Sequence, residues 1–222
     1  EGHMEKLDYK KEYKDLYLPK AKPMLIKVPN MKFIMVKGKG DPNCGTGEYQ
    51  EALSLLYALS FTIKMSKLGK HSIEGYFEYV VPPLEGFWWN EGNKAVDYSD
   101  KEKFEWISMI RQPEFVTQEV FDWACEEVKN KKGLEVSKAE FVELEEGLCV
   151  QMLHKGSYDD EPKTIVAIEE YIRDNQLKND IGSKLENGVI RRHHEIYLSD
   201  PRKAKVENLK TVIRIPVVRE KK

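Results

Sequence analysis

The 222-residue sequence has little cysteine, no long apolar run and almost no net charge. Lys and Arg number 36 against 38 Asp and Glu, so the basic excess of a dedicated nucleic-acid binder is missing. No stretch approaches the roughly 20 apolar residues that a membrane span needs, and no signal peptide is visible. The three cysteines share no CxxC spacing, which favours reduced thiols and a cytoplasmic protein. We therefore expect no direct contact with nucleic acid or with a membrane.

The first 30 residues do not have the pattern of a folded domain. Glu1–His3, before Met4, resembles the remnant of a purification tag. Residues 6–22 have little periodicity, and the prolines at 19, 23 and 29 discourage a helix. We expect a tag remnant and an extended arm over residues 1–30, followed by a single domain over residues 31–222.

Strands and helices are predicted by two different apolar periodicities in the rest of the chain. Apolar, aromatic and β-branched runs predict strands at 32–37, 76–81, 104–111, 147–153, around Glu195 and at 211–218. Apolar residues at steps of three and four predict helices at 48–68, at 118–132 after Thr117, and from Pro162. The charged stretch 129–146 is predicted to be a solvated surface. The fold class is therefore α+β.

The second half repeats the order of features found in the first. Lys37-Gly38 aligns with Lys155-Gly156, Tyr76–Glu78 with His193–Glu195, and Ile110–Pro113 with Ile213–Pro216. Repeats fix the architecture, and this one predicts two duplicated β-α-β-β units, about 31–116 and 147–219, joined by a helical linker. We expect pseudo-two-fold symmetry, and a central ligand cleft between the halves with Glu78 near Glu195.

The segment around Glu195 is a short strand with one polar face. Alternate side chains of a strand share a face, so His193, Glu195 and Tyr197 point one way. Such a face either meets bulk water or lines a pocket. In a pocket, a desolvated carboxylate can act as a general base, and a tyrosine can stabilise a carbonyl oxygen that gains negative charge. Glu78, the repeat partner of Glu195, is either a second cleft carboxylate or an exposed side chain.

Several aromatic residues are further candidates for contacts with a ligand. Trp88, Trp89, Trp106 and Tyr158 could form a flat box for a planar ligand, and each could instead be ordinary core. His193-His194-Glu195 together with His154 suggests a metal at first. Adjacent histidines on a strand point to opposite faces, however, and no HExxH or CxxC motif is present. We expect no metal and no organic cofactor.

The combination of these features resembles the GyrI-like small-molecule-binding superfamily. The resemblance rests on the duplicated β-α-β-β order, on His154–Tyr158 and on Glu195–Pro201, and it covers the chain after about Met31. Residues 82–89, Pro-Pro-Leu-Glu-Gly-Phe-Trp-Trp, resemble the larger stand-alone branch, some of whose members are similar to hydrolases that open the cyclopropane ring of DNA-alkylating natural products. No DNA-binding helix-turn-helix precedes the domain, unlike in the regulators of this superfamily.

The resemblance implies a cleft glutamate at Glu195, aromatic walls and a planar aromatic small molecule as partner. We expect Glu195 and Tyr197 to be catalytic, in a detoxifying hydrolase. We expect ligand contacts from Glu78, Trp88, Trp89, Trp106, Met109, Tyr158, His154 and His193. The alternative is a non-catalytic protein that sequesters a drug or modulates DNA gyrase. A gyrase contact is disfavoured, because the acidic residues are interspersed with lysines.

Overall fold

The computed structural model describes residues 5–44, 47–92 and 96–221. The tag remnant Glu1–His3 lies outside these residues. The strands are β1 (Met24–Lys39), β2 (Leu84–Asn90), β3 (Phe104–Gln112), β4 (Ala139–Lys155), β5 (Leu177–Asn179), β6 (His193–Tyr197) and β7 (Lys210–Arg219). The α-helices are α1 (Tyr9–Glu12), α2 (Lys14–Tyr17), α3 (Glu48–Lys64), α4 (Gln118–Lys132) and α5 (Glu161–Asp174).

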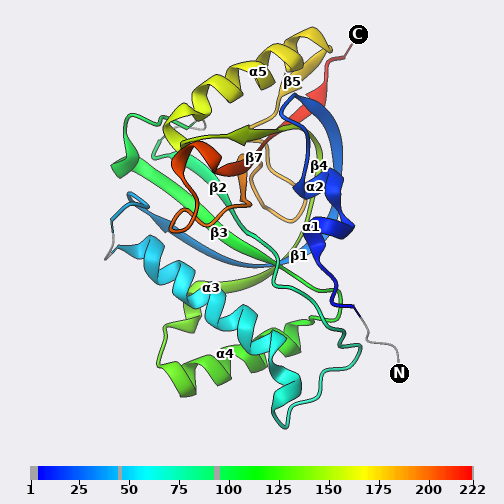
Figure 1. The fold of residues 1–222 in the computed structure, drawn as a ribbon, viewed down its shortest axis with the longest axis vertical. Coiled ribbons are helices and arrows are strands. Elements are labelled where there is room, and N and C mark those ends of the chain that lie inside the picture. Colours follow the sequence, from blue (N-terminus) through cyan, green and yellow to red (C-terminus); the bar gives the residue numbers. More distant parts are fainter. Residues whose placement is uncertain (1–4, 45–46, 93–95, 222) are drawn as a thin grey trace.

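One antiparallel sheet, closed on itself, organises the molecule. Its strand order is β4-β1-β3-β2-β6-β7-β5, and β4 also pairs with β7, so six of the strands form a barrel. Helix α3 packs against β1, β3 and α4, whereas α5 packs against β4, β5 and β7. In Figure 1, α3 and α4 lie at the lower end of the molecule, whereas α5 lies at the upper end, near the C-terminal strand β7. The mixed α/β architecture agrees with the predicted fold class.

Helix ends follow local chemistry that the sequence reveals. The Thr117 side chain accepts a hydrogen bond from the Val120 backbone N–H at 3.2 Å and caps α4. Gly133 ends the same helix with φ 64°, a left-handed conformation that glycine adopts without a steric penalty. At α5, Pro162 occupies the first turn, where no hydrogen-bonding N–H is required.

The extended arm predicted for the N-terminal residues is wrong over its described part. Residues 9–12 and 14–17 are helical, and residues 24–30 form the first half of β1. The side chains of Tyr9, Leu16 and Tyr17 are buried. The Arg111 guanidinium lies 4.6 Å from the ring centre of Tyr9 and donates a hydrogen bond to the Tyr17 hydroxyl at 3.1 Å. Tertiary contacts thus stabilise turns that are too short to give a periodic pattern.

The structure contradicts two further predictions made from the sequence. Residues 76–81 form no strand, apart from a bridge between Leu7 and Tyr79, and β2 begins only after Pro82-Pro83. Glu78 instead forms an ion pair with Lys67. The supposed solvated surface at 129–146 contains the first half of β4, in which charged residues alternate with a buried leucine, Leu144, and a buried carboxylate, Glu146.

The order β1-α3-β2-β3 is followed, after α4, by β4-α5-β5-β6-β7. Apart from the short strand β5, this is the order expected of two β-α-β-β units, and their duplication stays a prediction. The alignment of Glu78 with Glu195 does not agree with the strand register. Ile110 pairs with Leu84 in the first half, and Ile213 pairs with Glu195 in the second. If the two Ile-Arg-x-Pro segments correspond, the counterpart of Glu195 is Leu84.

The inside of the barrel contains a buried ionic cluster. His194 Nε2 lies 2.8 Å from Glu85 Oε1, and His194 Nδ1 lies 2.9 Å from Glu146 Oε2. Arg214 Nη1 donates to Glu146 Oε1 at 3.2 Å, and Arg214 Nε donates to Gln151 Oε1 at 2.9 Å. All five side chains are buried. Only an imidazolium can donate to two carboxylates, so the geometry favours a positively charged His194.

The charge on His194 predicts how stability depends on pH. Burial disfavours that charge, but the Glu146 carboxylate and the hydrogen bonds to Glu146 and Glu85 outweigh burial and raise the pKa of His194 above 6.5. A raised folded-state pKa gives stability that is complete below the unfolded pKa and lost as pH rises through the folded pKa. We expect the free energy of unfolding to fall above pH 6.5, by up to about 1.4 kcal/mol per pH unit.

Urea unfolding of the wild type between pH 5.5 and 9 measures this slope, and an NMR titration of the imidazole measures the His194 pKa directly. The matched control is His71→Gln, because His71 stacks on Trp123 outside the barrel and should leave the slope unchanged. A wild-type stability that stays flat or rises over this range would contradict the prediction.

Candidate functional site

The alternation of β6 directs its side chains to two different environments. His194 points into the barrel, whereas His193, Glu195 and Tyr197 point to the outer face, beneath α3 and α5. The predicted sharing of a face by these three side chains is confirmed by their mutual hydrogen bonds. This face is buried and does not meet bulk water, because Glu195 is only 6% exposed.

Glu195 accepts hydrogen bonds on both carboxylate oxygens. His193 Nε2 donates to Oε2 at 2.7 Å, and the Tyr197 hydroxyl donates to Oε1 at 2.9 Å. Burial by itself would raise the pKa of Glu195, but the hydrogen bond and charge of His193 and the hydrogen bond of Tyr197 outweigh burial, so the pKa is lowered to about 2. Glu195 is therefore an ionised, oriented carboxylate at neutral pH.

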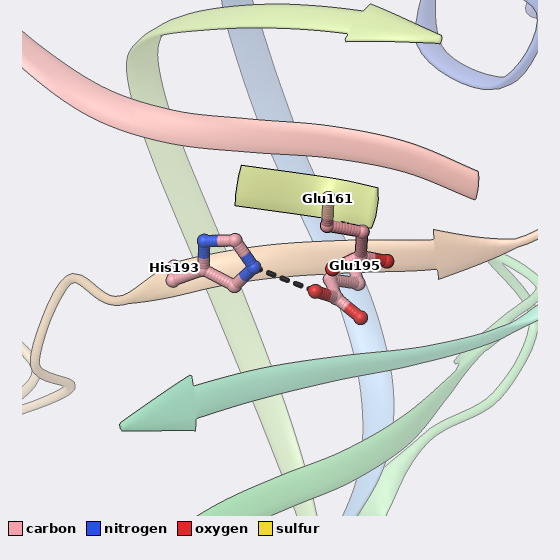
Figure 2. A group of neighbouring side chains, drawn as sticks. All are labelled: Glu161, His193 and Glu195. Atoms are coloured by element: carbon pink, nitrogen blue, oxygen red, sulfur yellow. Dashed lines mark hydrogen bonds and ion pairs between the residues drawn. The ribbon is translucent and has the colours of Figure 1, made fainter. Parts of the chain in front are cut away.

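A second carboxylate faces Glu195 from the first residue of α5. Glu161 is fully buried, and Figure 2 shows it opposite His193 and Glu195. The Tyr98 hydroxyl donates to Glu161 Oε2 at 2.7 Å and lies 3.4 Å from Glu195 Oε2. Burial, and next the negative charge of Glu195, raise the pKa of Glu161 well above 4.5. The two carboxyl groups are therefore driven toward opposite protonation states.

Aromatic rings cover this acid–base group from the side of α3. Tyr49 lies edge-on to Trp106 at 5.2 Å between ring centres and is tilted against Trp88 at 5.6 Å. Trp88 Nε1 donates to the Tyr197 hydroxyl at 2.8 Å, and Tyr158 packs edge-on against Tyr197. Trp88 and Tyr158, which the sequence predicted as ligand contacts, thus touch Tyr197. Trp106, predicted likewise, is linked to Trp88 through Tyr49 of α3.

The ring of Trp106 has its place because Gly38 lacks a side chain. Gly38 pairs with Trp106 across β1 and β3, and a Cβ at residue 38 would overlap the ring, lying 2.9 Å from Cζ3 and still closer to two other ring atoms. We expect Gly38→Ala to lower the free energy of unfolding by about 1–3 kcal/mol, as overpacking does, and to change the fluorescence of Trp106.

Chemical unfolding followed by tryptophan fluorescence measures both effects. The matched control is Gly69→Ala, whose Cβ would meet only the Ser66 carbonyl oxygen, at 3.6 Å. Equal stabilities of the two variants would show that the Trp106 ring is not fixed by this contact.

Four of the proposed ligand contacts lie away from Glu195. Trp89 points to the other face of β2, where its indole donates to Glu105 and Arg192 stacks on it. Met109 lies on the opposite face of β3 from Trp106, and pairs with Glu85. Glu78 is paired with Lys67. His154 donates from Nε2 to the Ser157 carbonyl at 2.7 Å and contacts Thr164 Oγ1 through Nδ1, also at 2.7 Å, so it fixes the turn that carries Tyr158 and Glu161.

Sequence reasoning missed three residues of this group. Tyr49 belongs to the helix predicted at 48–68, Glu161 directly precedes the helix predicted from Pro162, and Tyr98 lies in a loop without periodicity. No local pattern in the sequence indicates any of the three, because their contacts join residues far apart in the chain.

By distance alone, the same group could hold a cation. One donor atom from each of Glu161, His193 and Glu195 lies within 4.8 Å of the others. However, His193 Nε2 already forms a hydrogen bond with Glu195 Oε2 at 2.7 Å. The Tyr98 hydroxyl likewise donates a hydrogen bond to one oxygen of Glu161. The arrangement of the described side chains is that of a hydrogen-bonded acid–base group, and we assign no metal ligands to it.

A surface hollow lies elsewhere on the molecule. It has a volume of about 740 Å³ and lies between the C-terminal part of α3 and α4, lined by Phe61, Met65, Leu68, His71 and Trp123 among others. None of its lining residues belongs to the acid–base group. The hollow is open to solvent, so the buried group around Glu195 remains the candidate functional site.

Comparison with known proteins agrees with the fold described above. The sequence profile of the GyrI-like small molecule binding domain matches residues 21–218. A crystal structure described as a hydrolase from Listeria innocua is 47% identical, with a TM-score of 0.83, and the match covers 96% of this chain and 100% of that one. An uncharacterised conserved protein from Listeria innocua is 48% identical over the same shares, with a TM-score of 0.87.

A more distant likeness concerns the fold alone. The C-terminal domain of EcmrR is 12% identical, with a TM-score of 0.50, over 89% of this chain and 98% of that domain. No protein of curated function matches the sequence. Among the helices of residues 5–44, 47–92 and 96–221, none combines the length and apolarity needed to cross a bilayer.

Proposed function

Because the chain belongs to the family of GyrI-like small molecule binding domains, we propose that it binds a planar aromatic molecule between α3 and α5 and hydrolyses it. The proposed substrates are cyclopropane-containing, DNA-alkylating natural products, and the role is detoxification in the cytoplasm. The observation that carries the proposal is Glu195, a buried, ionised carboxylate next to aromatic rings. The description of a 47% identical neighbour as a hydrolase supports the reaction class.

Two buried polar atoms on the same sheet face support a ligand with heteroatoms. Trp106 Nε1 and Ser108 Oγ make no hydrogen bond with any described residue. Ser108 pairs with Gly86, which pairs with Glu195, so both atoms belong to the face of the acid–base group. Buried polar groups normally have a partner, and a bound molecule with acceptor atoms would supply one.

The proposed step uses water and the strain of the ring. Glu195 removes a proton from water, the water oxygen bonds to the cyclopropane carbon, and the strained C–C bond breaks. Its electron pair moves through the conjugated system onto the carbonyl oxygen, which becomes a phenolate and then takes up a proton. The products are an alcohol and a phenol, and the only reactant besides the substrate is water.

Tyr197 is the proposed hydrogen-bond donor to that carbonyl oxygen, although its hydroxyl proton already has an acceptor in the structure. Its hydroxyl proton is donated to Glu195 at 2.9 Å, while Trp88 donates to its oxygen at 2.8 Å. A tyrosine has one proton to give. In the proposed step Tyr197 therefore turns its hydroxyl from Glu195 to the substrate, and this frees Glu195 Oε1 to accept the proton of water.

The test is turnover with excess substrate. We expect incubation with a cyclopropane-containing alkylating compound to yield more than one equivalent of ring-opened, hydrated product, detected by mass spectrometry. Saturation at one equivalent with unchanged compound would reject hydrolysis and leave a protein that sequesters its ligand. Heat-denatured protein is the control for spontaneous ring opening.

A further inference from the structure

Glu161 and Glu195 are two buried carboxyl groups that face each other across the end of α5 and the middle of β6. Neither has a large contact with solvent, since Glu161 is 0% and Glu195 is 6% exposed. The Tyr98 hydroxyl lies between them, 2.7 Å from Glu161 Oε2 and 3.4 Å from Glu195 Oε2. Figure 2 shows Glu161 next to Glu195, which is hydrogen-bonded to His193, and donor atoms of the three residues lie within 4.8 Å of one another.

Counting donors assigns different protonation states to the two groups. Glu195 receives hydrogen bonds from His193 at 2.7 Å and from Tyr197 at 2.9 Å. Glu161 receives only the single proton of Tyr98, and its other oxygen, Oε1, is buried without any hydrogen-bond partner among the described residues. A buried carboxylate with fewer donors is the costlier one to ionise.

The remaining charged and titratable groups around Glu161 do not offset a second negative charge. Asp159, two residues earlier, adds a like charge, and Lys101 pairs with Asp159 at 3.2 Å near the surface. Tyr158 and Tyr49 are neutral phenols whose pKa values burial raises. His154, on β4, is bonded to Thr164 and Ser157. No lysine or arginine among the described residues forms an ion pair with either carboxyl group.

We propose that Glu161 and Glu195 form a proton-sharing pair in which Glu161 holds the proton while Glu195 remains the base. An oxygen of Glu161 lies within 4.8 Å of an oxygen of Glu195, and two carboxylates this close and this buried do not both ionise, as in other carboxyl dyads. Glu161 is a positioning residue, because it faces Glu195 and acts on the substrate only through Glu195. Its neutral form keeps the pair at one negative charge, which leaves Glu195 basic and makes the site selective against anionic ligands.

The proton-sharing pair predicts a bell-shaped dependence of turnover on pH. This part of the inference rests on the proposed function. Activity rises as Glu195 loses its proton and falls at higher pH as Glu161 loses its own, because a second charge repels the first and separates the pair. The two apparent pKa values of this profile belong to the pair and not to either residue alone.

The first experiment does not need a substrate. We expect the infrared spectrum of the wild type at neutral pH to contain the carbonyl stretch of a protonated carboxylic acid, shifted in D₂O and absent from Glu161→Gln. Asp159→Asn is the matched control, because it removes an exposed carboxylate from the same turn and should keep the band. A neutral-pH wild-type spectrum without a protonated acid would overturn the proposal, whether or not the protein hydrolyses anything.

The second experiment measures turnover against pH. Glutamine imitates the protonated acid, so Glu161→Gln should keep the acidic limb and lose the alkaline one. Tyr98→Phe is an independent variant: it removes the hydrogen bond that favours ionised Glu161, so its alkaline limb should move to higher pH. An alkaline limb unchanged in both variants would overturn the proposal. If the infrared band is present but no variant or wild type turns over substrate, the proposed function fails and the proton-sharing pair stands.

Discussion

Glu195→Gln is expected to reduce the rate of cyclopropane opening by about 10²–10⁴-fold, the usual contribution of a general base. Glutamine has nearly the same size, and its amide oxygen can accept the hydrogen bond of Tyr197, so the aromatic cover should stay in place. It cannot take a proton from water. The loss should therefore fall on the rate of the chemical step and leave ligand affinity within a few-fold of the wild type.

Single-turnover mass spectrometry with excess protein measures that rate, and quenching of tryptophan fluorescence by the ligand measures affinity. Glu78→Gln is the matched control, because it makes the same change on a carboxylate that pairs with Lys67 away from the site. A wild-type rate in Glu195→Gln would remove Glu195 from the mechanism. Loss of affinity with an unchanged rate would reassign Glu195 to ligand binding.

Glu146→Ala is expected to lower the free energy of unfolding by about 3–5 kcal/mol, as when one partner of a buried ion pair is removed. Glu146 accepts from Arg214 at 3.2 Å and from His194 at 2.9 Å inside the barrel. Their charges lower the pKa of Glu146 despite its burial. Alanine would leave two cations buried with one carboxylate, Glu85, to face them.

Urea unfolding at pH 6 measures the loss, and a hydrogen-exchange experiment locates it. Protection should fall in β4, β6 and β7, the strands that carry Glu146, His194 and Arg214. Glu143→Ala is the control, because Glu143 lies three residues earlier on β4 with an exposed side-chain hydrogen bond to Asn30. Similar stabilities of the two variants would mean that the ionic cluster does not hold the barrel together.

The parts of the site that the sequence predicts are those that depend on strand alternation. His193, Glu195 and Tyr197 follow from a period of two, and so does the absence of His194 from their face. The same rule, applied to β2, separates Trp88 from Trp89, which the aromatic-box hypothesis had combined. Trp89 lies on the opposite face of β2 against Arg192, and Trp88 donates a hydrogen bond to Tyr197.

The rest of the site depends on contacts that no local pattern records. Tyr98 lies in an irregular loop and reaches Glu161, 63 residues later in the chain. The ionic cluster inside the barrel consists of residues from β2, β4, β6 and β7, and charged residues in a strand normally predict exposure. Likewise, α1 and α2 have four residues each, so their stability comes from packing against Arg111 and neighbouring strands.

The alternation of β6 limits how this protein can vary during evolution. A shift of β6 by one residue relative to its neighbouring strands, which a change in its length can cause, would exchange the two faces of the strand. His194 would then face Glu161 in the site, and the carboxylate of Glu195 would enter the barrel beside Glu85 and Glu146. The proposed catalysis and the folding would fail together, although none of the side chains in the two clusters had been substituted. Homologues that share both clusters should therefore accept substitutions around β6 more readily than any change in its length.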